Sequence, residues 1–475
     1  MGRNRRQQPS AKQHKQNPRS TRPLRAIGAI DPDQPTMDIP TQVRQAIHLG
    51  ARSSYGRFLD QALVDSVVDV LLAAAHNGLI DVEIIMSQSL INRLEELYDG
   101  CWQPVDVAHA THRIASAHLM DLLRDVVDVE ALRSGAAQRA PRTWLDQLSV
   151  VLAGRKSPTA AWPNASHTAD VGASPDQIDS LVTRWRTRCG LDLSGGLYDS
   201  LELLGKLDTL TTLTCIGPVP KRWPATHIDI DIDIDARDER STADPKMLTR
   251  IRALLAKAEA TTFPAEADAF TSKAQDLMTR HAIHAAVLHA SSFDNEHDLE
   301  GDVVARRVHL DNPYSAEKVT LLGVVYRANG ARIAWHDTYG FCTVVGLAVD
   351  LDLAEVMFTS LLLQATKSVG EASVGPAHTR TRQYRQAFLV AFAIRIGERL
   401  GDAVDDATTQ ATCEYGTSLA PILAARADAV DRQFDKMFPG AGQMRGRSFN
   451  LGGWNAGLAA ADQAVLDLDR RSIDR

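Results

Sequence analysis

Apolar residues recur every three or four positions through residues 38–154, which is the spacing of amphipathic helices. One apolar stripe runs from Phe58 to Ala75, and a second extends from Ile80 to Tyr98. Pro104 can occupy the first turn of a third helix that continues to about Leu132, because the amides of a first turn lack intrahelical partners. The pattern predicts an N-terminal helical bundle over residues 38–154.

Two polar segments interrupt the helical pattern in the middle of the chain. Residues 155–175 are rich in Pro, Ser and Ala and predict a linker, and residues 176–222 predict a further helical segment. Residues 223–243 contain the alternation HIDIDIDID, which would place four carboxylates on one face of an extended segment. We interpret this segment as an acidic linker or an exposed edge strand. The alternative is a Ca²⁺ or Mg²⁺ site, although a flat row of carboxylates cannot wrap a hard cation.

Helix and strand signals are mixed in the last third of the chain. Residues 291–312 are polar and acidic and predict a linker, after which residues 313–475 predict a small α+β domain. Its predicted elements are a helix to about Ala328, strands at Ala331–Trp335 and Phe341–Val345, and helices to about Val369 and over Thr381–Thr412. Asp337 and Gly340 between the two strands favour a turn, so we expect a two-stranded hairpin covered by helices.

Residues 244–290 predict a helical hairpin, with Asp244-Pro245 at the start of one helix and Pro264 at the start of the next. The segment DPKMLTRIRALLAKAEATTFPAEADAFTSKAQDLMTRHAI closely resembles the domain of unknown function 2786. The matching motif positions include Leu254, Leu255, Ala258, Glu259, Glu266, Ala267, Gln275, Met278 and His281. The resemblance implies that the following region is the companion domain found after this hairpin in long, actinobacterial-type members. It implies no established activity.

Composition limits the class of protein. The chain has 475 residues, of which 44% are hydrophobic and 23% charged, as in a globular protein of two to four domains. It contains no apolar run near the ~20 residues of a membrane-spanning helix, and its N-terminus lacks the apolar core of a secretory signal. The five cysteines are widely spaced and include no CxxC pair, so we expect reduced thiols and a cytoplasmic location.

The net charge of −7 is unevenly distributed. Residues 1–30 carry eight basic side chains and no acidic ones, so the remaining chain is strongly acidic. Residues 1–37 lack enough apolar side chains to form a core, and we expect a disordered basic tail. Such a tail can contact nucleic acid through charge alone, or it can serve only to keep the protein soluble.

Arginines near the end of the chain form the best candidate for an anion site. Three lie where a loop enters a predicted helix, where free amides and the helix dipole favour anions, and two lie in a glycine-rich segment. They are Arg380, Arg382, Arg385, Arg445 and Arg447. The glycine-rich segment lacks the lysine of a phosphate-binding P-loop. The alternative is a solvated surface on which each arginine pairs with a separate carboxylate.

Two groups of histidines resemble metal ligands at first sight. They are Asp106, His109 and His112, and His281, His284 and His289. Three-residue steps drift around a helix in the first group, and the second group has no nearby cysteine and no HExxH motif. We therefore assign no metal and no cofactor.

Together these observations predict a mainly α, multidomain protein: an N-terminal helical bundle, a central helical hairpin and a C-terminal small α+β domain with a β-hairpin. The function that best fits is that of a non-enzymatic binding or scaffold protein that contacts nucleic acid or phosphate. The alternative is an enzyme acting on a phosphorylated or nucleic-acid substrate, with or without a metal.

Overall fold

The computed structural model describes residues 38–56, 59–153, 180–216, 245–260, 264–292, 302–372, 381–440 and 456–460. The chain divides into two compact units, one made of Met1–Leu90 with Ile178–Asp208 and the other of Ile91–Gln177 with Thr209–Arg475. The boundary after Leu90 falls inside residues 38–154, for which we predicted a helical bundle. The fold is mainly helical with a small sheet in the C-terminal region, which confirms the predicted fold class.

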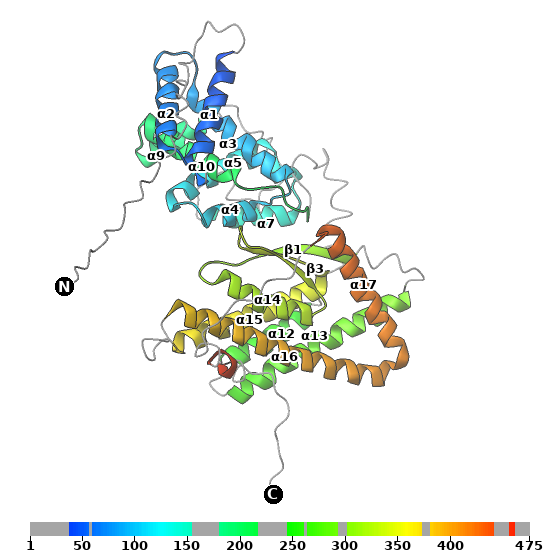
Figure 1. The fold of residues 1–475 in the computed structure, drawn as a ribbon. Coiled ribbons are helices and arrows are strands. Elements are labelled where there is room, and N and C mark those ends of the chain that lie inside the picture. The colour runs from blue at the N-terminus through cyan, green and yellow to red at the C-terminus, as the bar shows by residue number, and fades with distance from the viewer. Residues whose placement is uncertain are drawn as a thin grey trace, which may run out of the picture. The chain divides into compact units, whose positions relative to one another are not determined.

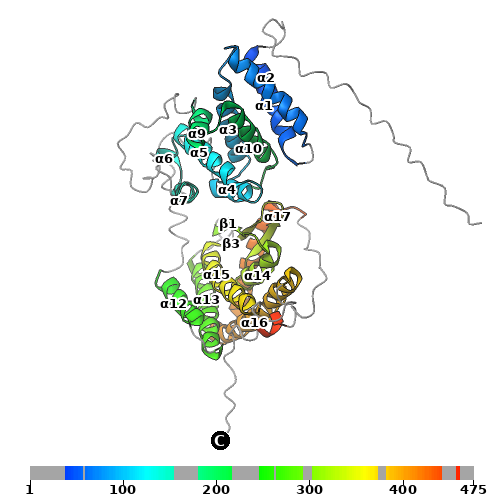
Figure 2. The same ribbon diagram turned by 90° about the vertical axis from the view of Figure 1, so that its left-hand side faces the viewer.

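The first unit is helical (Figure 2). Its elements are α1 (Ile39–Ser54), α2 (Gln61–His76), the first half of α3 (Val82–Asp99), α9 (Leu181–Cys189) and α10 (Leu193–Asp208). Helices α1 and α10 approach closely at Gly205, where a Cβ atom would lie 2.3 Å from the carbonyl oxygen of Ala51. Arg186 of α9 forms two hydrogen bonds with the Glu83 carboxylate of α3. Helices from the two halves of this unit thus share one core.

The second unit combines helices with the sheet. Its elements are the second half of α3, α4 (Pro104–His112), α5 (Ala117–Arg133), α6 (Ala136–Arg139), α7 (Arg142–Val151), α12 (Pro245–Ala260), α13 (Pro264–Ser292), β1 (Val303–His309), α14 (Ser315–Ala328), β2 (Arg332–His336), β3 (Phe341–Leu347), α15 (Ala348–Ala372), α16 (Arg382–Tyr415), η8 (Gly416–Ser418) and α17 (Leu419–Met437). The single helix predicted from Pro104 to Leu132 is wrong. It is two helices, because Ser116 caps a new helix by accepting a hydrogen bond from the Leu119 amide.

The sheet has three antiparallel strands in the order β1-β3-β2. The hairpin of β2 and β3 agrees with the sequence pattern, but β1 lies inside residues 291–312, where we expected a linker. The strand contains two charged residues, Arg306 and Arg307. Each forms an ion pair with a carboxylate that is distant in sequence, Asp352 and Asp106 respectively. The predicted two-stranded hairpin is therefore a three-stranded sheet.

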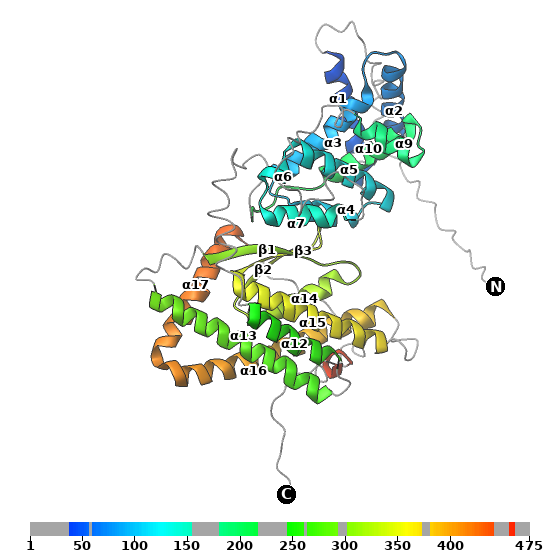
Figure 3. The same cartoon turned by 180° about the vertical axis from the view of Figure 1, so that it is seen from behind.

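The main core lies on one face of the sheet (Figures 1 and 3). Helices α14 and α15 pack there, and α12, α13 and α16 complete the layer of helices. Ile251 and Leu255 of α12 and Met278 of α13 belong to the same buried cluster as the strand residue Val344. The hairpin of residues 244–290 is thus part of the α+β core.

The opposite face of the sheet packs on α17, a helix that sequence periodicity did not predict. Ala429, Val430 and Phe434 of α17 bury Val303 and Val345 of the strands.

Among the described residues, no helix combines the length and the apolar character that spanning a membrane requires.

Candidate functional site

A long groove runs beside β2, with a volume of about 980 Å³. All five residues of β2 line it, so the edge of the strand forms its floor. One wall is α14, with Val319, Gly323 and Arg327, and the other is the C-terminal end of α17, with Phe434 and Phe438. The groove therefore exists only where three elements of the second unit meet.

The floor of the groove is a sheet edge. Within the described residues β2 pairs with β3 alone, from Arg332 opposite Val345 to His336 opposite Phe341. The outer backbone amides and carbonyls of an edge strand are directed away from its partner and are available to another chain. A smaller cavity of about 380 Å³ lies beside the other edge strand, β1.

The groove is apolar with positive charge at its walls. Ile333, Trp335 and Phe438 supply apolar surface, and Arg327 is exposed at the end of α14. The Arg332 guanidinium lies 4.7 Å from the centre of the Phe434 ring and pairs with Asp431. This combination suits a ligand that has both apolar and acidic groups.

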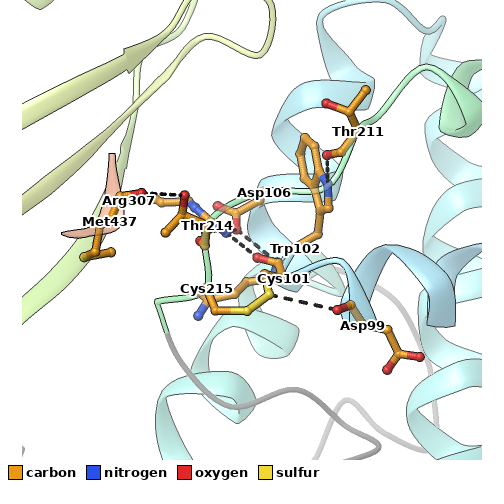
Figure 4. The surroundings of a disulfide bond; sticks show 10 residues. Asp99, Cys101, Trp102, Asp106, Thr211, Thr214, Cys215, Arg307 and Met437 are labelled. Atoms are coloured by element: carbon orange, nitrogen blue, oxygen red, sulfur yellow. Dashed lines mark hydrogen bonds and ion pairs between the residues drawn. A yellow bond between two sulfur atoms is a disulfide. The ribbon is translucent and has the colours of Figure 1, made fainter. Parts of the chain in front are cut away.

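Asp106 of α4 lies near Arg307 of strand β1 (Figure 4). Its carboxylate is fully buried and accepts hydrogen bonds from Arg307 Nη1, from the Gln103 amide at 3.0 Å and from His309 Nε2 at 2.8 Å. Burial raises the pKa of Asp106, but the hydrogen bond from His309 and the charge of Arg307 outweigh it, so the pKa is lowered. Asp106 thus stays ionised and holds α4 on β1.

Two further histidines adjoin this ionic cluster. The His109 ring centre lies 4.8 Å from that of His309, and His109 Nε2 donates to the Gly340 carbonyl oxygen at 3.1 Å. Burial and the neighbouring His309 lower the pKa of His109 to about 4. Burial and the charge of Arg307 likewise lower the pKa of His336, which lines the groove, to about 4. Both histidines are neutral at pH 7.

A disulfide lies next to the cluster and corrects the expectation of five reduced thiols. Cys101 and Cys215 are bonded, with their Cα atoms 4.8 Å apart and a sequence separation of 114. Arg307 donates to the Cys101 carbonyl and to the Thr214 carbonyl, each at 2.9 Å (Figure 4). The indole of Trp102 also donates to the Thr211 carbonyl, at 2.8 Å. These long-range contacts bring the two cysteines together, and nothing in their local sequence indicates the pairing.

The predicted anion site stays a prediction. Arg382 and Arg385 lie in the first turn of α16, which Thr381 caps by accepting a hydrogen bond from the Tyr384 amide at 3.2 Å. Arg382 is exposed, and the buried Nε of Arg385 has no hydrogen-bond partner among the described residues. Arg380, Arg445 and Arg447 lie outside the described residues.

The motif positions of the hairpin have structural roles where the structure describes their side chains. Leu255, Ala258 and Met278 are buried and Leu254 is half-buried. The buried Gln275 amide donates to Asn329 Oδ1 at 3.3 Å and so links α13 to the end of α14. Other motif positions are the half-buried Glu259 and His281, and Glu266 and Ala267, whose side chains lie outside the description.

The histidine groups examined as metal ligands do not converge. Asp106 contacts His309 rather than His112, and His112 is exposed. His281 is half-buried and His284 is exposed, while the side chain of His289 lies outside the description. The described part of the chain contains no cluster of three or more His, Cys, Asp or Glu residues that could hold a metal ion.

Sequence analysis did not identify Arg307, His309 and His336 as members of a site. These three residues have in common that they lie in strands. The strand register places His309, Phe341 and His336 side by side across the sheet. Recognising VVARRVH as a strand would have placed Arg307 and His309 on one face.

Comparison with known proteins adds one assignment. Residues 246–285 match the family described as "Protein of unknown function (DUF2786)". Neither the curated proteins nor the solved structures contain a significant match to the chain. The matched segment corresponds to the hairpin of α12 and α13, whose apolar stripe contributes to the core of the second unit. The similarity to this family therefore covers the hairpin of residues 246–285 within a chain of 475 residues.

Proposed function

We propose that this chain is a non-enzymatic binding protein that takes up an extended peptide in the groove along β2, as an added strand of the sheet. The observation that carries the proposal is the groove of about 980 Å³ whose floor is an edge strand. In this mode of recognition, backbone hydrogen bonds supply affinity, and alternate side chains of the peptide enter pockets on either side.

The walls of the groove select the kind of peptide. Ile333 and Trp335 offer an apolar surface, which suits aliphatic side chains at every second position. The exposed Arg327 adds positive charge, which favours acidic residues between the apolar ones. The ligand is therefore an extended peptide in which apolar and acidic residues alternate. Residues 227–235 of this chain have that pattern and lie outside the described residues, so they provide the sequence for a probe.

The test is a titration with a fluorescent peptide of residues 227–239 and with a peptide of the same composition in which the alternation is broken. The protein is the full chain with Ile230 and Ile232 replaced by Ser, so that its own copy of the pattern does not compete. Thr320→Trp fills the groove from α14, and Thr366→Trp on the exposed part of α15 is the matched control.

We expect the alternating peptide to bind, and Thr320→Trp to weaken it about tenfold or more, which corresponds to about 1.4 kcal/mol. The Thr366→Trp control is expected to bind like its parent. Equal binding of both peptides, or unchanged affinity in a folded Thr320→Trp variant, would overturn the proposal. Absence of saturable binding by the alternating peptide would overturn it as well.

Nucleic-acid or phosphate contact through residues 1–37 and the five arginines stays part of the proposal as a separate contact. The same titration is made with a single-stranded oligonucleotide, with and without residues 1–37. Salt-sensitive binding that disappears with the tail supports a charge contact. Oligonucleotide binding that Thr320→Trp removes would assign the groove to nucleic acid instead.

An enzyme acting on a phosphorylated or nucleic-acid substrate is the alternative proposal, and the hydrogen-bonded Asp106 and His309 are the pair it would use for proton transfer. The cytoplasmic location, the companion-domain assignment and the actinobacterial type stay predictions.

A further inference from the structure

A second cavity, of about 170 Å³, lies between the end of α3 and the helices α5 and α6. It is unrelated to the groove along β2. Helix α3 contributes Glu95, Tyr98 and Asp99, and α5 and α6 contribute Glu130, Arg133 and Arg139. A cavity of this volume admits a small organic molecule and excludes a peptide.

Two polar side chains in the cavity wall are buried. Tyr98 is 0% exposed, and its hydroxyl has no hydrogen-bond partner among the described residues. Glu130 is 1% exposed. A buried hydroxyl without a partner loses free energy relative to one that is hydrogen-bonded, so the Tyr98 hydroxyl indicates a missing ligand group or water.

Several of the charged groups in the wall already have partners. Arg133 lies 3.4 Å from Glu95, and Arg139 donates to the Ser134 carbonyl at 3.4 Å. With all three carboxylates ionised, the wall has one negative charge more than the two arginines supply. Burial and the neighbouring Glu95 raise the pKa of Glu130 to about 8, so this carboxyl is protonated at pH 7. A monocation bound beside Glu130 would compensate the charge of its ionised carboxylate.

We propose that this cavity binds a small organic monocation of the alkylguanidinium type, with the Glu130 carboxylate and the Tyr98 hydroxyl as hydrogen-bond acceptors. A guanidinium has several N–H donors in one plane, so it can reach two acceptors at once. A neutral ligand of the same shape leaves Glu130 protonated and gains no charge-assisted hydrogen bond.

The test is calorimetric titration of the full chain with methylguanidinium, with methylurea as the neutral molecule of similar shape. Glu130→Gln is expected to fold, because the amide resembles the protonated carboxyl in shape and charge. Glu96→Gln is the matched control, since Glu96 is exposed on the same helix as Tyr98 and pairs with Arg93. Tyr98→Phe removes the hydroxyl and keeps the ring that packs edge-on against Trp144.

We expect methylguanidinium to bind and methylurea not to bind. Glu130→Gln should lower the affinity at least tenfold, Tyr98→Phe should lower it by a smaller factor, and Glu96→Gln should leave it unchanged. Binding at pH 7 should release about one proton, seen as a dependence of the heat on the buffer, and the release should fall to about half near pH 8 and fade at higher pH. Equal binding of methylurea, unchanged affinity in Glu130→Gln, or no saturable binding would overturn the proposal and leave the cavity to water.

Discussion

At the scale of single residues, Asp106 is the side chain that joins α4 to the sheet. Its carboxylate is fully buried, and so is the Arg307 guanidinium with which it pairs. Burying two charges is costly, and the cost is offset here because Asp106 also accepts hydrogen bonds from His309 and the Gln103 amide. The pair therefore specifies where α4 lies on β1.

Removing one member of this pair should be far more harmful than removing both. Asp106→Ala leaves the Arg307 guanidinium buried without its carboxylate, and we expect a loss of about 3–5 kcal/mol in the free energy of unfolding, measured by urea denaturation. Asp106→Ala combined with Arg307→Met should recover a large part of that loss. Single and double variants of equal stability would show that the two charges are not coupled.

At the scale of secondary-structure elements, the family hairpin contributes directly to the core of the second unit. Ile251 and Leu255 of α12 lie in the cluster that also contains Leu351 of α15. Apolar stripes at helical spacing predict such helices well, because the spacing is a property of the neighbouring residues alone. The partner that covers a stripe is not encoded in its spacing.

Leu255→Ala should therefore destabilise the whole second unit. Leu255 is 2% exposed, and truncating a buried leucine costs about 2–5 kcal/mol. Leu254→Ala, at the half-buried neighbouring position, is the control and should cost clearly less. Circular dichroism and intrinsic tryptophan fluorescence, to which Trp335 of the sheet contributes, should report one shared transition in denaturant. A separate early transition of the helices would show that the hairpin folds independently of the core.

Strand β1 is an element that the local sequence pattern does not predict. The sequence VVARRVH has two adjacent charged residues and resembles a linker when it is considered alone. Arg306 pairs with Asp352, 46 residues away, and Arg307 pairs with Asp106, 201 residues away. A strand whose charges are neutralised over such distances is not recognisable from its own pattern.

At the scale of the whole molecule, segments far apart in sequence are combined within each unit. Residues 178–208 belong with the first unit, and residues 209–216 return to the second. In the second unit, the Leu213 amide donates to the Gly100 carbonyl at 2.9 Å, and Cys215 is bonded to Cys101. The disulfide thus closes a long loop that leaves this unit and comes back to it.

The disulfide leads to a prediction about thiol content. Cys189, Cys342 and Cys413 are free, so thiol titration of the denatured chain should detect three thiols before reduction and five after it. Cys215→Ser should lower the free energy of unfolding by about 2–4 kcal/mol, because the unfolded chain loses a loop constraint. Cys413→Ser, at an exposed position, should have little effect. Five thiols without reductant would restore the expectation of reduced cysteines.

Most of the helices, the β2–β3 hairpin and the similarity of residues 246–285 to a family could be derived from residues that are close in sequence, whereas α17 and the break before α5 were not. Helical periodicity, turn residues such as Asp337 and Gly340, and the motif of residues 246–285 are all local signals. The third strand, the disulfide, the Asp106 cluster and the groove could not, because each depends on groups brought together by folding. The groove is lined by α14, β2 and α17 together. The buried charge of Asp106 is compensated by its contacts with Arg307 and His309. Local pattern decides which segments form helices and strands, whereas burial, charge compensation and shape between distant segments decide where a ligand can bind.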